Sequence, residues 1–107
     1  MPYRLAFLIS LVVAAGVFAG PTDAQLDAAL AAVKKEKKVK DATWNSRGFP
    51  SLIVGVWDDK TRRDGYAQYL CGVLKDHGVK GGKVRILDQA AALKDEWTEL
   101  GTADCPN

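Results

Sequence analysis

The stretch Ser51–Gly78, with the sequence SLIVGVWDDKTRRDGYAQYLCGVLKDHG, decides the fold expected for this 107-residue chain. Residues 52–57 form an apolar run that is broken only by Gly55, with Pro50 before it and two aspartates after it. Enrichment in β-branched and aromatic side chains between turn-forming residues is typical of a strand. Because the run does not alternate with polar residues, we expect a central strand with both faces covered.

The second half of this stretch predicts an amphipathic helix over Arg62–His77. Thr61 is placed to act as its N-cap, and Asp64 follows three residues later, as the partner in a capping box does. Gly78 suits the position just past the helix end, where a left-handed conformation is common. Apolar or amphipathic residues recur at helical spacing along one face: Tyr66, Leu70, Val73, Leu74 and His77.

Residues 1–19 do not read as part of the folded domain. Arg4 and the amino terminus are positive, and the apolar run Leu5–Ala19 that follows is shorter than the roughly 20 residues that span a bilayer. This pattern is typical of a secretory signal peptide, with small-residue cleavage sites after Ala19 and after Ala24. We therefore expect export to the periplasm or the cell exterior, with residues 20–107 forming one domain. The alternative is an uncleaved segment 5–19 that anchors the protein in the inner membrane.

Cys71 and Cys105 are the only two cysteines. An even cysteine count in a small exported domain indicates a disulfide. Such a bridge would tie the central helix to the C-terminus and contribute roughly 3–4 kcal/mol of stability by the loop-entropy relation.

The remaining elements complete a small two-layer domain. We expect an N-terminal helix over Thr22–Lys38 with Thr22 and Gln25 as a capping box, a short edge strand around Trp44, and strands over 83–88 and 97–103. The central helix then connects two parallel strands by a right-handed crossover. The predicted fold class is α+β or small α/β, with three or four strands, one disulfide and the N-terminal helix on the opposite sheet face or extending away.

No catalytic or metal-binding motif stands out. Asp58, Asp59 and Asp88 could together hold Mg²⁺ at strand ends, but a solvated turn is the simpler interpretation. His77 is the single histidine, and six residues separate it from Cys71, so the two do not share a helix face. We therefore expect no catalytic residue, no metal and no cofactor. An enzyme is the least favoured of three interpretations.

Two surfaces are candidates for partner binding. Arginine and aromatic residues are enriched among the residues that contribute most of the binding energy of interfaces. This favours a surface made of Trp57, Asp58, Asp59, Arg62, Arg63, Tyr66 and Tyr69. We expect replacement of Arg62 and Arg63 by alanine to weaken partner binding while leaving the fold nearly unaltered. A basic patch is the second candidate and consists of Lys34, Lys35, Lys37, Lys38 and Lys40.

Together these features predict a small exported, disulfide-stapled binding or accessory protein that acts by protein contact. The alternative is a membrane-anchored accessory subunit of an envelope complex. We expect no nucleic acid as partner, because the protein is exported and no aromatic residue is interleaved with the lysines. A membrane would be a partner only if the N-terminal segment is retained.

Overall fold

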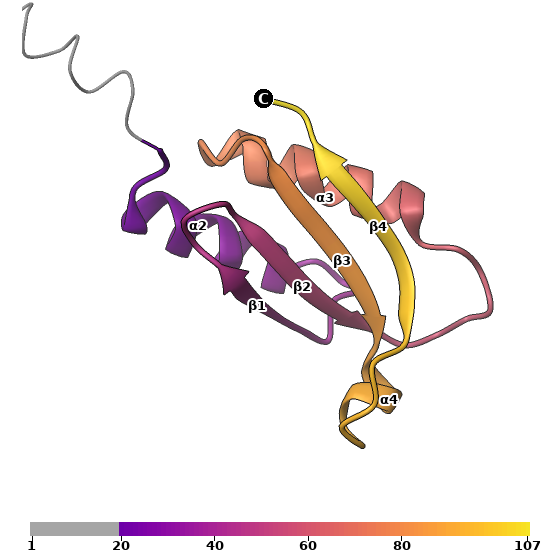
Figure 1. Ribbon diagram of the computed structural model, residues 1–107. Helices are drawn as coiled ribbons and strands as arrows, with labels where there is room; N and C mark the ends of the chain where they lie inside the picture. The colour runs from indigo at the N-terminus through magenta and orange to yellow at the C-terminus, as the bar shows by residue number, and fades with distance from the viewer. Residues whose placement is uncertain (1–19) are drawn as a thin grey trace, which may run out of the picture.

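The computed structural model describes residues 20–107, and the predicted signal peptide or anchor at 1–19 lies outside them. The described chain forms a four-stranded mixed sheet whose spatial order follows the sequence (Figure 1). The middle pair is parallel and both outer pairs are antiparallel. The strands are β1 (Asp41–Ser46), β2 (Ser51–Val56), β3 (Gly82–Asp88) and β4 (Glu99–Cys105). The predicted α+β class is confirmed, and β2 lies in the interior of the sheet.

Two helices, α2 (Asp23–Lys34) and α3 (Asp64–Asp76), pack on the same face of the sheet, behind it in Figure 1. The core lies between these helices and the inward side chains of the strands, among them Leu52, Val54 and Ile86, which are fully buried. The expectation that the N-terminal helix covers the opposite face or extends away is wrong. The helix lies on the same face as α3 because its apolar stripe packs against α3 and β1.

The start of α2 follows the sequence signal closely. Thr22 Oγ1 accepts from the Gln25 N–H at 3.1 Å, and Gln25 Oε1 accepts from the Thr22 N–H at 2.9 Å, so the predicted capping box is present. The helix ends at Lys34, four residues before the expected end at Lys38, so only the first lysine of the basic patch belongs to it. The indole Nε1–H of Trp44 donates to the Leu26 carbonyl at 3.1 Å, which fastens the edge strand β1 to this helix.

The helix α3 begins two residues later than expected and ends one residue earlier, with His77 as its C-cap. Thr61 does not cap it, because its N–H and hydroxyl both donate to Asp59 Oδ1. At the other end Gly78 has φ +83°, and the N–H groups of Gly78 and Val79 donate to the carbonyls of Lys75 and Leu74. These two bonds are those of a Schellman motif, in which the left-handed residue is usually glycine.

The strand β4 is fixed to the start of α3. The Arg63 N–H donates to the Leu100 carbonyl at 3.0 Å, and the Thr102 N–H donates to Asp64 Oδ1 at 2.9 Å. Gly101 lies so close to the Arg63–Asp64 backbone that a Cβ there would collide with it. The disulfide Cys71–Cys105, with Cα atoms 5.3 Å apart, joins the same two elements. The predicted bridge is therefore confirmed.

Candidate functional site

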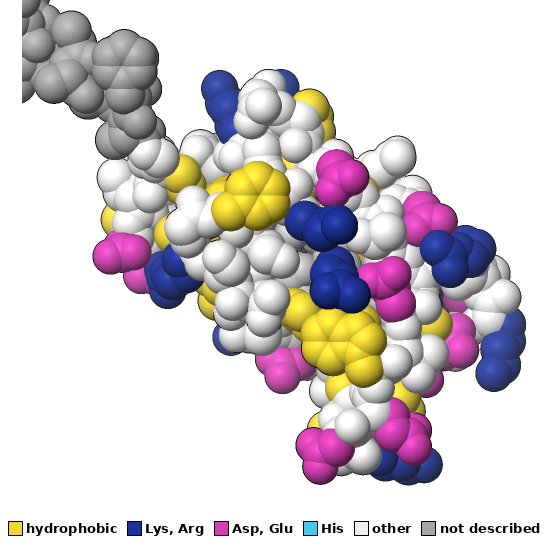
Figure 2. Space-filling view, viewed as in Figure 1, with side chains coloured by type: hydrophobic (Ala, Val, Ile, Leu, Met, Phe, Trp, Pro, Cys, Tyr) yellow, Lys and Arg dark blue, Asp and Glu magenta, His cyan; other side chains and the backbone are white. Residues whose placement is uncertain are grey.

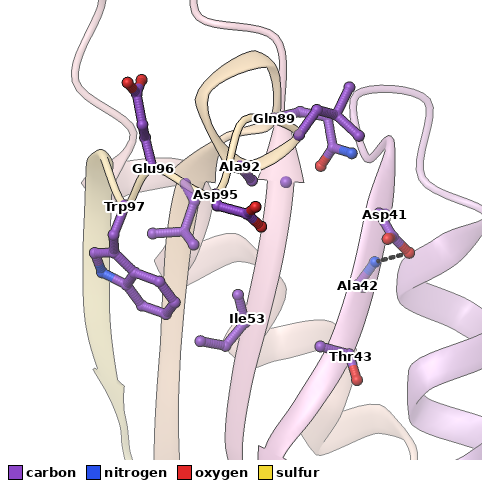
Figure 3. A pocket seen from close by; sticks show the side chains of 12 residues that line it. Asp41, Ala42, Thr43, Ile53, Gln89, Ala92, Asp95, Glu96 and Trp97 are labelled. Carbon is purple, nitrogen blue, oxygen red and sulfur yellow. Dashed lines mark hydrogen bonds between the residues drawn. The ribbon is translucent and has the colours of Figure 1, made fainter.

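A hollow of about 450 Å³ lies on the sheet face opposite the two long helices. Its floor is formed by Ile53 and Gly55 of β2 and Leu87 of β3. Figure 3 shows Ile53 on the sheet between β1 and the loop that carries Trp97. β1 borders it on one side, and the short helix α4 (Gln89–Ala92) with the loop that follows borders it on the other. The sequence predicted β2 to be covered on both faces, whereas here Ile53 is only half-buried.

Local hydrogen bonds hold the wall of the hollow in place. Asp88 Oδ1 accepts from the Ala90 N–H at 3.1 Å and so starts α4, and the Asp88 N–H donates to the Thr98 carbonyl at 2.9 Å, which closes the loop at its base. The Gln89 side chain lies directly over Gly55, where any Cβ would collide with it. Glycine at position 55 therefore lets this side chain lie against the floor.

Two large apolar side chains of this wall remain in contact with solvent. Trp97 is 57% exposed and Leu93 is 70% exposed. The guanidinium of Arg85 lies 5.1 Å from the Trp97 ring centroid, and Arg85 Nε donates to Glu99 Oε1 at 2.9 Å. Arg85 thus holds the ring beside the sheet by a cation–π contact. An exposed ring next to an apolar hollow is typical of a recognition surface.

The rim of the hollow is acidic. Asp41, Asp95 and Glu96 line it, and no lysine or arginine does. Within the described part of the chain, none of these three carboxylates has a cation within ion-pair distance. Figure 2 views the sheet from this side and shows hydrophobic side chains lying among charged ones. The site therefore combines an apolar floor with uncompensated negative charge.

The structure divides the first predicted interaction surface. Asp58 Oδ1 accepts from the Lys60 N–H, and Arg62 pairs with Asp64 at 3.0 Å. The hydroxyl of Thr61 donates to Asp59 and is the main reason that the pKa of this carboxyl lies below its ordinary value. The charged groups of the turn thus largely satisfy one another, and Trp57 is half-exposed beside them.

Arg63 is a buried residue of this turn and not a surface one. Its side chain is 8% exposed, and its Nη2 lies 3.1 Å from the Trp57 carbonyl oxygen and 3.2 Å from Asp59 Oδ2. The expectation that its replacement leaves the fold unaltered does not fit this burial. The sequence could not reveal it, because Arg62 and Arg63 are adjacent arginines in one polar turn and no local pattern shows which of them is buried.

The structure brings the two tyrosines of that surface to the basic patch. Tyr66 and Tyr69 stack with centroids 5.7 Å apart and line a second hollow of about 280 Å³ with Glu36, Lys37 and Lys38. The Tyr69 hydroxyl donates to Glu36 at 3.1 Å, and this bond raises its pKa. The other three lysines of the patch, Lys34, Lys35 and Lys40, are exposed and do not line this hollow.

Groups that could support metal chemistry are not gathered anywhere in residues 20–107. No three His, Cys, Asp or Glu side chains of this part lie close enough together to hold a metal ion. His77 Nδ1 forms a hydrogen bond with the Val73 carbonyl oxygen at 3.0 Å, as suits a residue at a helix end. Within the same residues, no helix is both long and apolar enough to cross a bilayer.

No protein-family model, curated protein or solved structure matches this chain. The function must therefore be inferred from the geometry of its surfaces.

The hollow was missed by the sequence-based prediction, although two signals point to it. Residues 83–88 (KVRILD) alternate, and the charged residues Lys83 and Arg85 of that pattern mark a sheet face that is not buried in a core. Leu93 and Trp97 are large apolar residues within an otherwise charged loop. Together these signals indicate an open sheet face with an apolar border.

Proposed function

We propose that this chain is a small exported, disulfide-stapled binding protein that acts by protein contact, and that its contact surface is the hollow on the open sheet face. The observation that carries this proposal is the exposure of Trp97 and Leu93 beside the apolar floor of Ile53 and Leu87. An apolar centre with an aromatic residue and a polar rim is the usual composition of an interface. The predicted turn surface at 57–63 is the weaker candidate, because its charges are internally paired.

Export is supported by the disulfide and by the pattern of residues 1–19. Disulfides persist in oxidising compartments such as the periplasm and the cell exterior. Cleavage after Ala19 keeps the capping box of Thr22 and Gln25, whereas cleavage after Ala24 removes Thr22. We therefore expect the N-terminus of the mature protein to be Gly20.

Affinity capture tests the contact surface. Tagged protein is incubated with the envelope fraction of its own source cells, and bound proteins are quantified by mass spectrometry. Trp97→Ala should reduce capture of the specific partner about tenfold, which corresponds to about 1.4 kcal/mol. Phe49→Ala is the matched control, because Phe49 is 67% exposed but does not line the hollow. Equal capture by wild type and a well-folded Trp97→Ala variant would remove the hollow as the binding surface.

The membrane-anchored alternative is supported by a different observation, the basic patch. In the described part of the chain, its five lysines have no carboxylate within ion-pair distance, so they could meet anionic headgroups next to a retained anchor. Fractionation with N-terminal sequencing separates the two locations. A soluble protein beginning at Gly20 supports export with cleavage, and a membrane-bound protein retaining residues 5–19 supports the anchor.

A further inference from the structure

We propose that the hollow binds a cationic amphipathic segment of a partner protein. An apolar side chain of that segment lies on the floor of Ile53 and Leu87 against Trp97, and its flanking Lys or Arg side chains face Asp41 and Asp95. This inference rests on the proposed function, since it names the chemistry of the partner that the same surface receives.

The size and lining of the hollow fit apolar side chains. Its volume of about 450 Å³ lies near the lower end of the roughly 300–1,000 Å³ of ligand pockets. Ile53, Ala92, Leu93 and Trp97 provide its exposed apolar surface, and Leu87, which is 3% exposed, adds little to it. Burying such a surface with a partner side chain is favourable by the hydrophobic effect.

The negative charge of the rim favours positively charged residues on either side of the partner's apolar side chain. Asp41 on β1 and Asp95 in the loop lie on opposite sides of the floor, and the Asp95 carboxylate points into the space between Trp97 and Gln89 (Figure 3). The nearby cation Arg85 is already engaged by Glu99 and Trp97. A partner with carboxylates beside its apolar residue would be repelled, whereas lysine or arginine there would be attracted.

A second copy of this chain is a poorer occupant. Its basic patch could supply the positive charge, but the only large apolar residue within residues 34–40 is Val39, which is 8% exposed. The patch therefore offers charge without an apolar side chain to fill the floor. A separate protein segment that carries both properties fits better.

Synthetic peptides test this chemistry on the mature protein. The probe is a heptapeptide of alternating lysine and leucine, and the comparison peptides replace leucine by serine or lysine by glutamate. Binding is measured by isothermal titration at two salt concentrations. The lysine–leucine peptide should bind, both comparison peptides should bind at least about tenfold more weakly, and added salt should weaken binding because it screens exposed charges.

Charge variants locate the site. The double change Asp41→Asn with Asp95→Asn should weaken binding about tenfold and reduce the salt dependence. The matched control, Asp76→Asn with Asp104→Asn, removes the same charge from exposed residues that do not line the hollow and should leave affinity within about twofold. Thermal melts establish that both variants fold.

The outcomes separate this inference from the function on which it rests. Undiminished binding by the Asp41/Asp95 variant, or equal binding of the glutamate–leucine peptide, would overturn the cationic partner. If the lysine–leucine peptide fails to bind while Trp97→Ala still reduces envelope capture about tenfold, the proposed function stands and only the proposed partner chemistry is wrong. A dimer that Trp97→Ala dissociates in sedimentation equilibrium would assign the hollow to a second copy instead.

Discussion

Arg62 and Arg63 are neighbours in the sequence, but their side chains lie in opposite environments. Arg62 is 69% exposed and pairs with Asp64, whereas Arg63 is 8% exposed and donates to the Trp57 carbonyl. Surface ion pairs contribute about 0–1 kcal/mol, while loss of a buried donor leaves its acceptor unpaired at about 1–3 kcal/mol. Their contributions to stability should therefore differ.

We expect Arg63→Ala to lower the free energy of unfolding by about 1–3 kcal/mol, and Arg62→Ala by no more than about 0.5 kcal/mol. The Arg63 Nε–H has no hydrogen-bond partner among the described residues, so part of the loss is offset by removing an unsatisfied donor. Urea denaturation of the two single variants measures the difference. Equal midpoints for both would contradict the structural role of Arg63.

At the scale of elements, the junction between α3 and β4 depends on the Asp64 carboxylate. The bond from the Thr102 N–H is the main cause of its lowered pKa, and the ion pair with Arg62 adds to it. A carboxyl whose pKa is lowered on folding contributes stability above its ordinary pKa of about 3.9. That contribution is lost as the pH falls below this value toward the folded-state pKa.

Asp64→Asn isolates this charge, because asparagine keeps the shape and can still accept from Thr102. We expect the variant to be less stable than wild type at neutral pH, and the gap to narrow as the pH falls below about 4. Chemical denaturation at several pH values measures the gap. Arg62→Ala should show a smaller stability gap to the wild type at neutral pH, because it removes only the ion pair, which is the second cause of the lowered pKa of Asp64. A gap that stays constant from neutral to acid pH would contradict the assigned pKa shift.

The elements that sequence predicted well are those defined by short-range contacts. The boundary at Gly78 was predictable because a Schellman motif is formed by residues a few positions apart, and the same holds for the capping box of Thr22 and Gln25. The start of α3 was predicted wrongly because Thr61 bonds Asp59, a competing local partner that the capping pattern does not distinguish.

The placing of α2 could not be read from sequence in the same way. Its stripe of Leu26, Ala29 and Val33 would suit either face of the sheet, and the choice depends on contacts with α3 and β1 that are distant in the chain. Among residues 20–107, this choice leaves one face of the sheet without a long helix, and only the short helix α4 lies at its border. The hollow is a consequence of that arrangement, and its lining comes from four separate parts of the chain. For that reason, the sequence pattern of one strand or one loop could indicate an open sheet face, but it could not show that these parts of the chain meet in one hollow.

On the scale of the whole molecule, the open face means that the core between the sheet and the two long helices must stabilise the fold without a second layer. Within residues 20–107, long helices pack on one side of the sheet only, so the core is thin. Small domains also bury a limited share of their surface. The disulfide Cys71–Cys105 closes the helix layer onto β4, which is an edge strand of the sheet. We therefore expect the disulfide to contribute a large part of the stability of this one-sided arrangement.

We expect the double change Cys71→Ala with Cys105→Ala to lower the free energy of unfolding by roughly 3–4 kcal/mol, because the unfolded chain regains the freedom of an uncrosslinked loop. The loss of local stability should be greatest at β4. Without the disulfide, the hydrogen bonds that join β4 to the start of α3 are those of Leu100 and Thr102 with residues 63 and 64. Hydrogen exchange should then show the Thr102 N–H losing protection before the interior strand β2. Intact mass of the wild type should rise by two hydrogens on reduction, and labelling of both cysteines in unreduced native protein would contradict the bridge. Protection lost uniformly across all strands would instead mean that the bridge stabilises the domain as one unit.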